Sequence, residues 1–361
     1  MKISLIAGAR PNFMKIAPII DAIKKAQLDG KNISYRLVHT GQHYDSKMSD
    51  SFFTDLNIPF PDINLACGSG TQTVQTASIM VAFEEELIAN PADIVMVVGD
   101  VTSTLACSIV AKKNNTIVAH VEAGIRSGDM GMPEEVNRIV TDSISDLFFT
   151  TSTWANSNLL KSGVSKDKIF FVGNVMIDTL LANKSKFKEP FFWNDFKLKK
   201  DKYFVLTLHR PSNVDNLDKL QGVIYDIASN TNGFPIIFPM HPRTVKAYTE
   251  LGVSHSNLFI VDPLGYHEFN YLVKNAVGVI TDSGGITEET TVMGVPCLTL
   301  RDSTERPETV QIGTNELIGT NSDAIKMALR KLLSGNWKSG AIPELWDGKA
   351  AERIINIILS L

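Results

Sequence analysis

The sequence predicts an α/β protein made of two doubly wound, Rossmann-like domains. Short apolar runs alternate with amphipathic segments along most of the chain, which is typical of strands separated by helices. The rhythm breaks once, in the lysine-rich residues 184–202. At 361 residues the chain is also long for one domain. Because strands separated by helices are joined by crossovers, both sheets are expected to be parallel.

Eleven apolar runs are the expected strands, and they are divided between the two halves. In the first half they are residues 3–7, 35–40, 94–98, 116–121, 147–150 and 169–172. In the second half they are residues 204–208, 235–240, 258–261, 277–281 and 296–300. Helical patterns lie between most of them, as in residues 14–26 and 323–333.

The domain boundary is placed at Gly173-Asn174, just before the lysine-rich break. This gives an N-terminal domain of residues 1–173 and a C-terminal domain of residues 174–347. The final segment carries apolar residues at helical spacing, Ile354, Ile355 and Ile358 among them. We expect this helix, residues 348–361, to cross back to the first domain. Residues 184–202 are interpreted as a solvated connector with a surface helix.

Composition excludes several classes of protein. The net charge of −4 gives no support for a nucleic-acid partner. Three scattered cysteines form neither a disulfide framework nor a zinc motif and suit a reducing compartment. No apolar stretch approaches the roughly 20 residues of a membrane-spanning helix, and the first apolar run is too short for a secretory signal. A cytoplasmic protein without a membrane partner is therefore expected.

One turn, from Thr281 to Glu289, stands out as a candidate phosphate site. Ser283, Gly284 and Gly285 lie where an apolar strand gives way to a helical pattern. Free N–H groups and the helix dipole favour an anion there, and glycine permits close approach to the backbone. The alternative is an ordinary tight βα turn.

Polar residues also follow the expected strands of the first half. Arg10 and Lys15 flank the start of the first helix, which suits a phosphate, although two surface cations would look the same. Asp100 ends an apolar strand and serves either catalysis or helix capping. Glu122 directly follows another buried strand. Ligands of parallel sheets bind at these strand ends, so a cleft between the two domains is expected.

Three further positions carry the same ambiguity. Glu134 opens an expected helix and lies four residues before Arg138, so an intrahelical ion pair is the alternative to a catalytic role. His209 and His241 each end a strand of the second half, where one histidine alone would more often be structural. The chain lacks a complete Gly-x-Gly-x-x-Gly motif, a Walker loop, a Gly-x-Ser-x-Gly elbow and any metal-ligand spacing. The remaining side chains suit acid–base chemistry on a phosphate-linked small molecule.

In order along the chain, these motifs closely resemble the non-hydrolysing UDP-N-acetylglucosamine 2-epimerases, over nearly the whole length. The matching motifs are Gly8-Ala9-Arg10-Pro11, Gly41-Gln42-His43, Val98-Gly99-Asp100, His120-Val121-Glu122-Ala123-Gly124, Pro133-Glu134-Glu135, His209-Arg210, Asp282-Ser283-Gly284-Gly285 and Glu305-Arg306-Pro307-Glu308. The resemblance implies a glycosyltransferase-B-like arrangement with an interdomain cleft. It implies reversible interconversion of UDP-GlcNAc and UDP-ManNAc with neither a cofactor nor a metal. Elimination of UDP, a 2-acetamidoglucal intermediate and re-addition of UDP would invert C2.

The resemblance also assigns roles by position. The implied catalytic residues are Asp100, Glu122, Glu134, His209 and Arg138. The implied UDP-binding residues are Arg10, Lys15, His241, Phe269, Ser283, Gly284, Gly285, Glu289 and Arg306. The second domain would thus be the UDP-binding one, and the family suggests a homodimer.

Two departures from many bacterial members concern regulation and substrate. The loop from Asp129 to Pro133 is short, and His43 is followed by Tyr44-Asp45. In those members this region binds a second, activating UDP-GlcNAc, so the sequence does not favour allosteric activation here. The same features resemble epimerases of UDP-2,3-diacetamido-2,3-dideoxyglucuronic acid, which is the alternative substrate. A glycosyltransferase-B enzyme or a non-catalytic nucleotide-sugar binding protein would share the fold.

Overall fold

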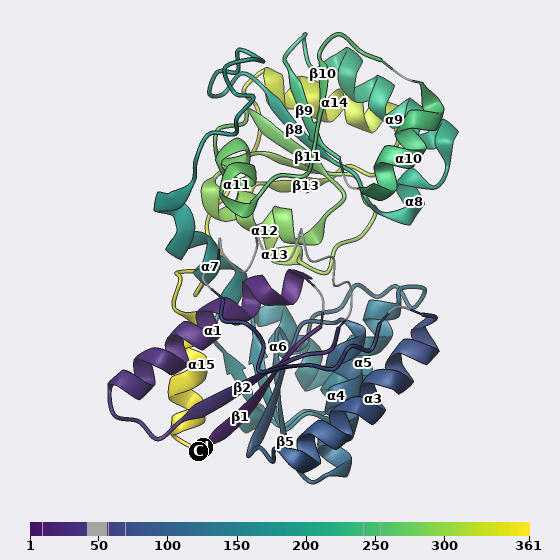
Figure 1. Cartoon of the computed structure of the whole chain (residues 1–361). Helices are drawn as coiled ribbons and strands as arrows, with labels where there is room; N and C mark the ends of the chain where they lie inside the picture. Colours follow the sequence, from purple (N-terminus) through teal and green to yellow (C-terminus); the bar gives the residue numbers. More distant parts are fainter. Residues whose placement is uncertain (9, 42–55, 57, 69, 241, 253) are drawn as a thin grey trace. The chain divides into compact units, whose positions relative to one another are not determined.

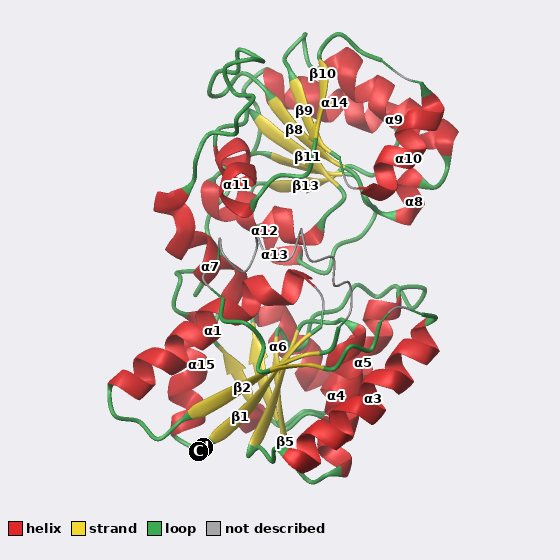
Figure 2. Ribbon diagram, viewed as in Figure 1, coloured by secondary structure: helices red, strands yellow, loops and turns green. Residues whose placement is uncertain are grey.

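The computed structural model describes the chain except residues 9, 42–55, 57, 69, 241 and 253, and at residues 10, 11, 242, 243, 246 and 247 it describes the backbone alone. The described residues form two units, Met1–Ala182 with Glu344–Leu361, and Asn183–Pro343. Each unit has one parallel sheet with helices on both faces (Figures 1 and 2). The predicted α/β class with two doubly wound sheets is confirmed. No helix in the described ranges is long and apolar enough to cross a bilayer.

The first unit is built on a sheet with the strand order β3-β2-β1-β4-β5-β6-β7. Its strands are β1 (Lys2–Ala7), β2 (Ser34–His39), β3 (Ile63–Asn64), β4 (Ile94–Val98), β5 (Ile117–Val121), β6 (Leu147–Thr150) and β7 (Ile169–Phe171). Its helices are α1 (Arg10–Leu28), α3 (Gln72–Ala89), α4 (Thr102–Lys113), α5 (Pro133–Ile144), α6 (Thr153–Lys161), η1 (Lys166–Lys168), α7 (Val175–Asn183) and α15 (Ala350–Leu359). The helices α1 and α15 pack together on one face of the sheet, and α3, α4 and α5 cover the other (Figure 1).

The second unit has the strand order β10-β9-β8-β11-β12-β13. Its strands are β8 (Phe204–Thr207), β9 (Ile236–Pro239), β10 (Leu258–Val261), β11 (Gly278–Thr281), β12 (Cys297–Thr299) and β13 (Asn315–Leu317). Its helices are η2 (Lys184–Lys186), α8 (Pro211–Val214), α9 (Leu217–Asn230), α10 (Pro242–Leu251), α11 (Tyr266–Lys274), α12 (Gly284–Met293), α13 (Pro307–Gln311) and α14 (Ser322–Leu333).

The apolar runs are continuous rather than alternating because both faces of each sheet are buried. On β8, Phe204 and Leu206 pack into the core formed with α9 and α14. Val205 points the opposite way and packs with Leu272 of α11. Since successive strand residues face opposite sides, one run of apolar residues supplies two cores. The ends of such strands are therefore the places where polar side chains are expected.

The domain boundary lies later than Gly173-Asn174, because α7 is tied to the first unit. The Asp178 carboxylate accepts hydrogen bonds from the backbone N–H groups of Ala350 (3.1 Å) and Ala351 (2.7 Å), at the start of α15. The Thr179 hydroxyl donates to the carbonyl of Met14 in α1. Residues 174–182 and the segment from Glu344 onward consequently belong to the first unit.

The prediction of a solvated connector with a surface helix at residues 184–202 is wrong. Beyond the short η2, the segment forms turns rather than an α-helix. Phe192 and Trp193 are buried in the core of the second unit, where Trp193 contacts Tyr203 edge-on at 5.6 Å between ring centroids. The many lysines made the segment look solvent-exposed, because composition alone does not show which side chains face inward.

Candidate functional site

Two candidate acids of the first unit follow neighbouring strands. Asp100 lies two residues after β4 and Glu122 directly follows β5. These strands pair in register, with Val98 opposite Val121, and the N–H of Gly99 donates to the carbonyl of Val121 at 3.0 Å. The two acids therefore emerge at the same edge of the sheet, as expected for parallel strands.

Glu122 is buried and ion-paired in an uncommon backbone conformation. Its Oε2 lies 2.6 Å from Nζ of Lys15, and its side chain is 2% exposed. Its φ is +68°, a region that costs a non-glycine residue about 1–3 kcal/mol. The end of the neighbouring strand β4 is also closely packed, because a Cβ added to Gly99 would lie 3.2 Å from Nζ of Lys15. Strain of this kind gathers at functional sites, so Glu122 is the leading candidate for a reacting group.

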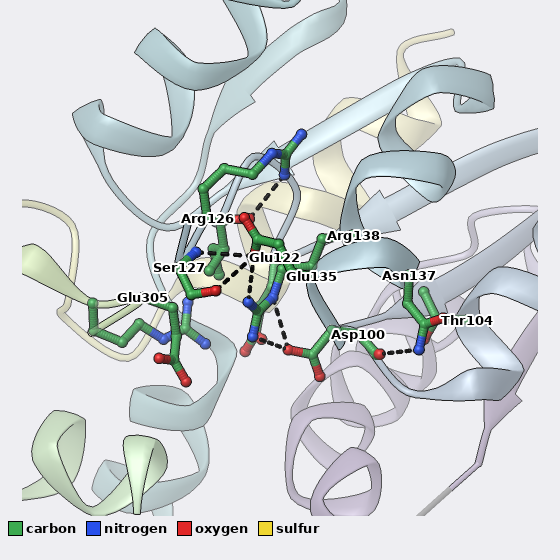
Figure 3. A network of polar contacts seen from close by, with 12 residues as sticks. Asp100, Thr104, Glu122, Arg126, Ser127, Glu135, Asn137, Arg138 and Glu305 are labelled. Carbon is green, nitrogen blue, oxygen red and sulfur yellow. Dashed lines mark hydrogen bonds and ion pairs between the residues drawn. The ribbon is translucent and has the colours of Figure 1, made fainter. Parts of the chain in front are cut away.

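Arg138 joins two acids rather than one. Its Nε and Nη2 donate to Oδ2 of Asp100 at 2.9 and 2.5 Å, and its Nη1 donates to Oε2 of Glu135 at 2.8 Å (Figure 3). The side chain of Arg138 is 4% exposed and that of Asp100 is 30% exposed. Helix capping does not account for Asp100, because its carboxylate is held by the guanidinium and Val101 is the N-cap of α4.

Glu135 anchors the loop that precedes α5. Its Oε2 accepts from the backbone and the hydroxyl of Ser127, at 2.9 and 3.0 Å, and its Oε1 accepts from the N–H of Gly128 at 3.0 Å (Figure 3). Burial alone would raise the pKa of Glu135, but these hydrogen bonds and that from Arg138 lower it. Glu135 therefore stays ionised and fixes Arg138.

Glu134 lies in the first turn of α5 and is half-buried. The intrahelical pair with Arg138 is absent, since Arg138 turns to Asp100 and Glu135. Within the described ranges no hydrogen bond or ion pair engages the Glu134 carboxylate. A carboxylate without such a partner at a helix start remains accessible for proton transfer.

A buried polar network holds the ends of β4 and β5 in place. His120 places Nδ1 2.7 Å from Oδ1 of Asp142 and Nε2 2.8 Å from the carbonyl of Gly99. Asp142 also accepts from Nη1 of Arg126 at 2.6 Å and from the N–H of Gly124 at 3.1 Å. Burial would raise the pKa of Asp142, but His120 and Arg126 lower it. The network thus fixes the backbone immediately before Asp100 and after Glu122.

In the second unit, Asp282 holds His209. Its Oδ1 lies 2.8 Å from Nδ1 of His209, and its carboxylate also accepts from the backbone N–H groups of His209 and Arg210. Asp282 is fully buried, whereas the His209 side chain is 45% exposed. Burial alone would raise the pKa of Asp282, but the hydrogen bond and charge of His209 and the backbone N–H groups lower it, and the net shift is downward. A fixed histidine with an accessible ring suits proton transfer or contact with an anion.

The predicted phosphate seat lies at the start of α12. Ser283 is the N-cap, with an extended backbone and without a side-chain hydrogen bond to the first turn. Gly284 is the first helical residue and Gly285 the second. The first N–H groups of a helix have no intrahelical partner, so this end attracts anions.

Three other predicted UDP-binding residues lie on or near α12 and differ in their burial and their partners. Arg306, the N-cap of α13, places Nε 2.8 Å from Oε1 of Glu288, and both side chains are buried. Phe269 on α11 is half-buried and, like Ile286, packs against the core cluster that contains Leu272 and Val279. Glu289 is 4% exposed and accepts from the Tyr266 hydroxyl at 3.2 Å. Burial raises the pKa of Glu289 to about 7.

This raised pKa predicts a pH-dependent cost in stability. Between about pH 4.5 and 7 the folded chain keeps a proton on Glu289 that the unfolded chain releases, so the free energy of unfolding falls as pH rises, by roughly 3 kcal/mol in total. Glu289→Gln removes this fall. The melting temperature of the variant relative to the unaltered protein should therefore increase from pH 5 to pH 8. An offset that stays constant with pH, as expected for the exposed control Glu250→Gln, would contradict the assignment.

Three predicted features lie partly or wholly outside the described residues. The backbone of Arg10 starts α1, but its side chain is not described. His241 lies outside the described residues, as does the His43-Tyr44-Asp45 sequence. In the part of the chain that is described, no group of three or more His, Cys, Asp or Glu side chains is arranged to hold a metal ion.

The sequence comparisons identify the family of the chain. The family model described as UDP-N-acetylglucosamine 2-epimerase matches residues 26–359. The chain belongs to the UDP-N-acetylglucosamine 2-epimerase family. A UDP-N-acetylglucosamine 2-epimerase of Methanocaldococcus jannaschii is 42% identical over 99% of both chains. A UDP-2,3-diacetamido-2,3-dideoxy-D-glucuronate 2-epimerase of Pseudomonas aeruginosa is 36% identical over the full length of both.

Solved structures of relatives support the same family and fold. The crystal structure of the M. jannaschii epimerase in complex with UDP-GlcNAc and UDP has a TM-score of 0.89 and covers all of both chains. A lipopolysaccharide outer core galactosyltransferase has a TM-score of 0.57 at 14% identity, which shows a shared fold alone. The predicted family and glycosyltransferase-B-like fold class are confirmed.

Two residues of the candidate site, Asp282 and Glu135, were not predicted as site residues. Asp282 and Glu135 lie inside motifs that the sequence singled out, yet their partners were not apparent. A usable signal exists for α5: Glu135, Arg138 and Asp142 are spaced by three and four residues, which places three ionisable groups on one helix face. A buried charged face on a helix is a sign of a functional network.

Proposed function

We propose that the protein interconverts UDP-GlcNAc and UDP-ManNAc by inverting C2 of the sugar. Membership of the epimerase family and the 42% identity to the M. jannaschii enzyme support this function. The observation that carries it is Glu122, a buried carboxylate at φ +68°, 2.6 Å from Lys15 and at the same sheet edge as Asp100. This is a set of groups suited to moving protons at a carbon atom.

Inversion of C2 cannot proceed by simple removal of the C2 proton. The C2 proton of the sugar has no adjacent carbonyl and is not acidic enough to be removed alone. In the proposed route the C1–O bond to UDP breaks as a base takes the C2 proton, which leaves a 2-acetamidoglucal. UDP then re-forms the bond to C1 while an acid delivers a proton to the opposite face of C2. The protein must therefore stabilise a departing diphosphate and supply proton-transfer groups for both faces.

The first unit is proposed to supply the proton-transfer groups. Asp100, Glu122 and Glu134 are the candidate acids and bases, and their surroundings differ. Asp100 is held by Arg138, Glu122 by Lys15, and the Glu134 carboxylate by no described group. Arg138 is proposed to orient Asp100. Different surroundings give chemically identical carboxyl groups different pKa values, which lets one act as an acid and another as a base.

The second unit is proposed to bind UDP. The N–H groups at the start of α12 and the fixed ring of His209 would stabilise the diphosphate as it leaves. Glu289 would accept hydrogen bonds from the ribose, and Phe269 would lie near uracil. The proposed UDP ligands of the second unit are His241, Phe269, Ser283, Gly284, Gly285, Glu289 and Arg306. Arg10 and Lys15 of the first unit are proposed as further UDP ligands.

A diacetamido-uronate substrate is the second candidate, favoured by the 36% identity to the P. aeruginosa enzyme. The two are separated by incubating the protein with each UDP-sugar and identifying products by NMR. We expect UDP-ManNAc from UDP-GlcNAc, with UDP remaining attached at equilibrium. Turnover of the diacetamido-uronate sugar alone would replace the proposed substrate, and free ManNAc would indicate a hydrolysing enzyme. Turnover that requires an acceptor would indicate a glycosyltransferase.

We propose that the protein is a homodimer, with α3 at the interface. Val74, Val81 and Ile88 are 56%, 62% and 66% exposed and recur every seven residues, so these apolar side chains lie on one face of α3. Val81→Glu would place a charge in that interface and should produce monomers in light scattering coupled to size-exclusion chromatography. The control Met327→Glu, at an exposed position of α14, should remain dimeric. A monomeric unaltered protein would contradict the proposal.

A further inference from the structure

Arg301 is a buried arginine that the proposed function does not use. It follows β12 by two residues and is 8% exposed. Its Nη2 donates to Oε2 of Glu305 at 2.8 Å. Its Nη1 is buried and makes no hydrogen bond with any described residue. An unsatisfied guanidinium N–H in the interior costs free energy, so a partner for Nη1 would be stabilising.

The Nη1 atom of Arg301 faces the start of α12. A Cβ built on Gly284 would lie 3.8 Å from this nitrogen and 2.9 Å from Oε1 of Glu305. Gly284 is the first residue of α12, whose N-cap Ser283 makes no side-chain capping bond. A buried cation with an open donor and a helix N-terminus thus point to the same space, and both favour an anion.

A carboxylate of the chain already occupies the edge of this space. Glu305 is paired with Arg301 and lies 3.7 Å from Nη2 of Arg210, measured from Oε1. Arg210 is itself tied to the turn before α12, since its Nε donates to the carbonyl of Asp282 at 2.9 Å. Two guanidinium groups therefore bracket one carboxylate, which leaves one net positive charge among the three side chains.

We propose that Arg301 is an additional phosphate-binding residue and that Glu305 is its resident counter-ion, which gives way when a diphosphate binds. The inference rests on the proposed function only in taking UDP as the ligand. Two oxyanions this close repel each other, so the Glu305 carboxylate opposes the phosphate that replaces it. Arg301 gains the partner that Nη1 lacks, because a guanidinium binds phosphate through two parallel N–H groups.

Binding of UDP to Arg301→Lys tests the first half of the proposal by calorimetry. Lysine keeps the charge but lacks the fork of donors, so the Kd of UDP should rise by about tenfold or more. Uridine, which has no phosphate, should bind the variant and the unaltered protein equally in saturation-transfer NMR. The control Arg330→Lys on α14 alters an exposed arginine and should leave UDP binding unchanged. Equal losses for UDP and uridine, or no loss for UDP, would overturn the role of Arg301.

Glu305→Gln tests the second half through the sign of its effect. Removal of the competing charge should tighten UDP binding by at least about threefold, with no change for uridine. Weaker or unchanged UDP binding would mean that Glu305 only orients Arg301, and would overturn the counter-ion role. This arm stands even if Arg301→Lys fails to fold. These binding measurements need no turnover, so they test Arg301 and Glu305 whether or not the protein epimerises UDP-GlcNAc. A protein that does not bind UDP would contradict both.

Discussion

Replacing Glu122 with glutamine is expected to lower kcat for epimerisation by about 10³-fold, within the range of removing a general acid or base. Glutamine keeps the shape of the side chain but cannot take a proton at C2. It also breaks the 2.6 Å ion pair with Lys15. The variant should still fold, because glutamine retains a carbonyl oxygen that can accept from the Lys15 ammonium. Activity is measured with UDP-GlcNAc by NMR, and folding by circular dichroism.

Glu344→Gln is the matched control for Glu122→Gln. Glu344 belongs to the same unit and its side chain is exposed. The control should retain full activity. If Glu122→Gln keeps near-normal turnover, Glu122 is not a reacting group, and its positive φ needs another explanation.

Removing the His209 ring is expected to have the next largest effect, a loss of about 10²- to 10³-fold in kcat. Asp282 holds Nδ1 of this ring at 2.8 Å, which orients the ring for exchange of a proton or contact with the diphosphate. His209→Ala deletes that group, while Asp282 keeps its backbone hydrogen bonds from residues 209 and 210. Steady-state kinetics with UDP-GlcNAc measure the change.

A comparison with His255→Ala shows whether the loss belongs to the site. His255 is a half-buried histidine of the same unit, packed edge-on against Tyr225. Its removal should leave kcat unchanged. Equal and small effects of both substitutions would remove His209 from the proposed mechanism.

The fold was predictable to the extent that it depends on hydrophobic burial. The strands expected at residues 94–98, 147–150 and 258–261 match β4, β6 and β10 residue for residue. The edge strands β3 and β13 were missed because they are two and three residues long and carry Asn64, Asn315 and Glu316. The other two edge strands, β7 and β10, consist wholly of apolar residues and were expected, so the polar residues are what hid β3 and β13.

The candidate acids were predictable, whereas their partners were not. Asp100 and Glu122 were indicated by their positions at the ends of expected parallel strands. The choice of Arg138 between Glu134 and Glu135 depends on the rotation of α5 against the sheet, which periodicity alone does not define. The link from His120 to Asp142 spans 22 residues and is set by packing of β5 against α5. Such contacts follow from tertiary structure and leave little local signal.

The proposed epimerisation breaks and re-forms the C2–H bond of UDP-GlcNAc. The most direct test is to incubate the protein with UDP-GlcNAc in deuterated water and to follow C2 by NMR. The proposed mechanism predicts that deuterium enters C2 and that UDP-ManNAc appears with deuterium at the same carbon. UDP-GlcNAc that keeps its C2 proton, with no UDP-ManNAc formed, would contradict it.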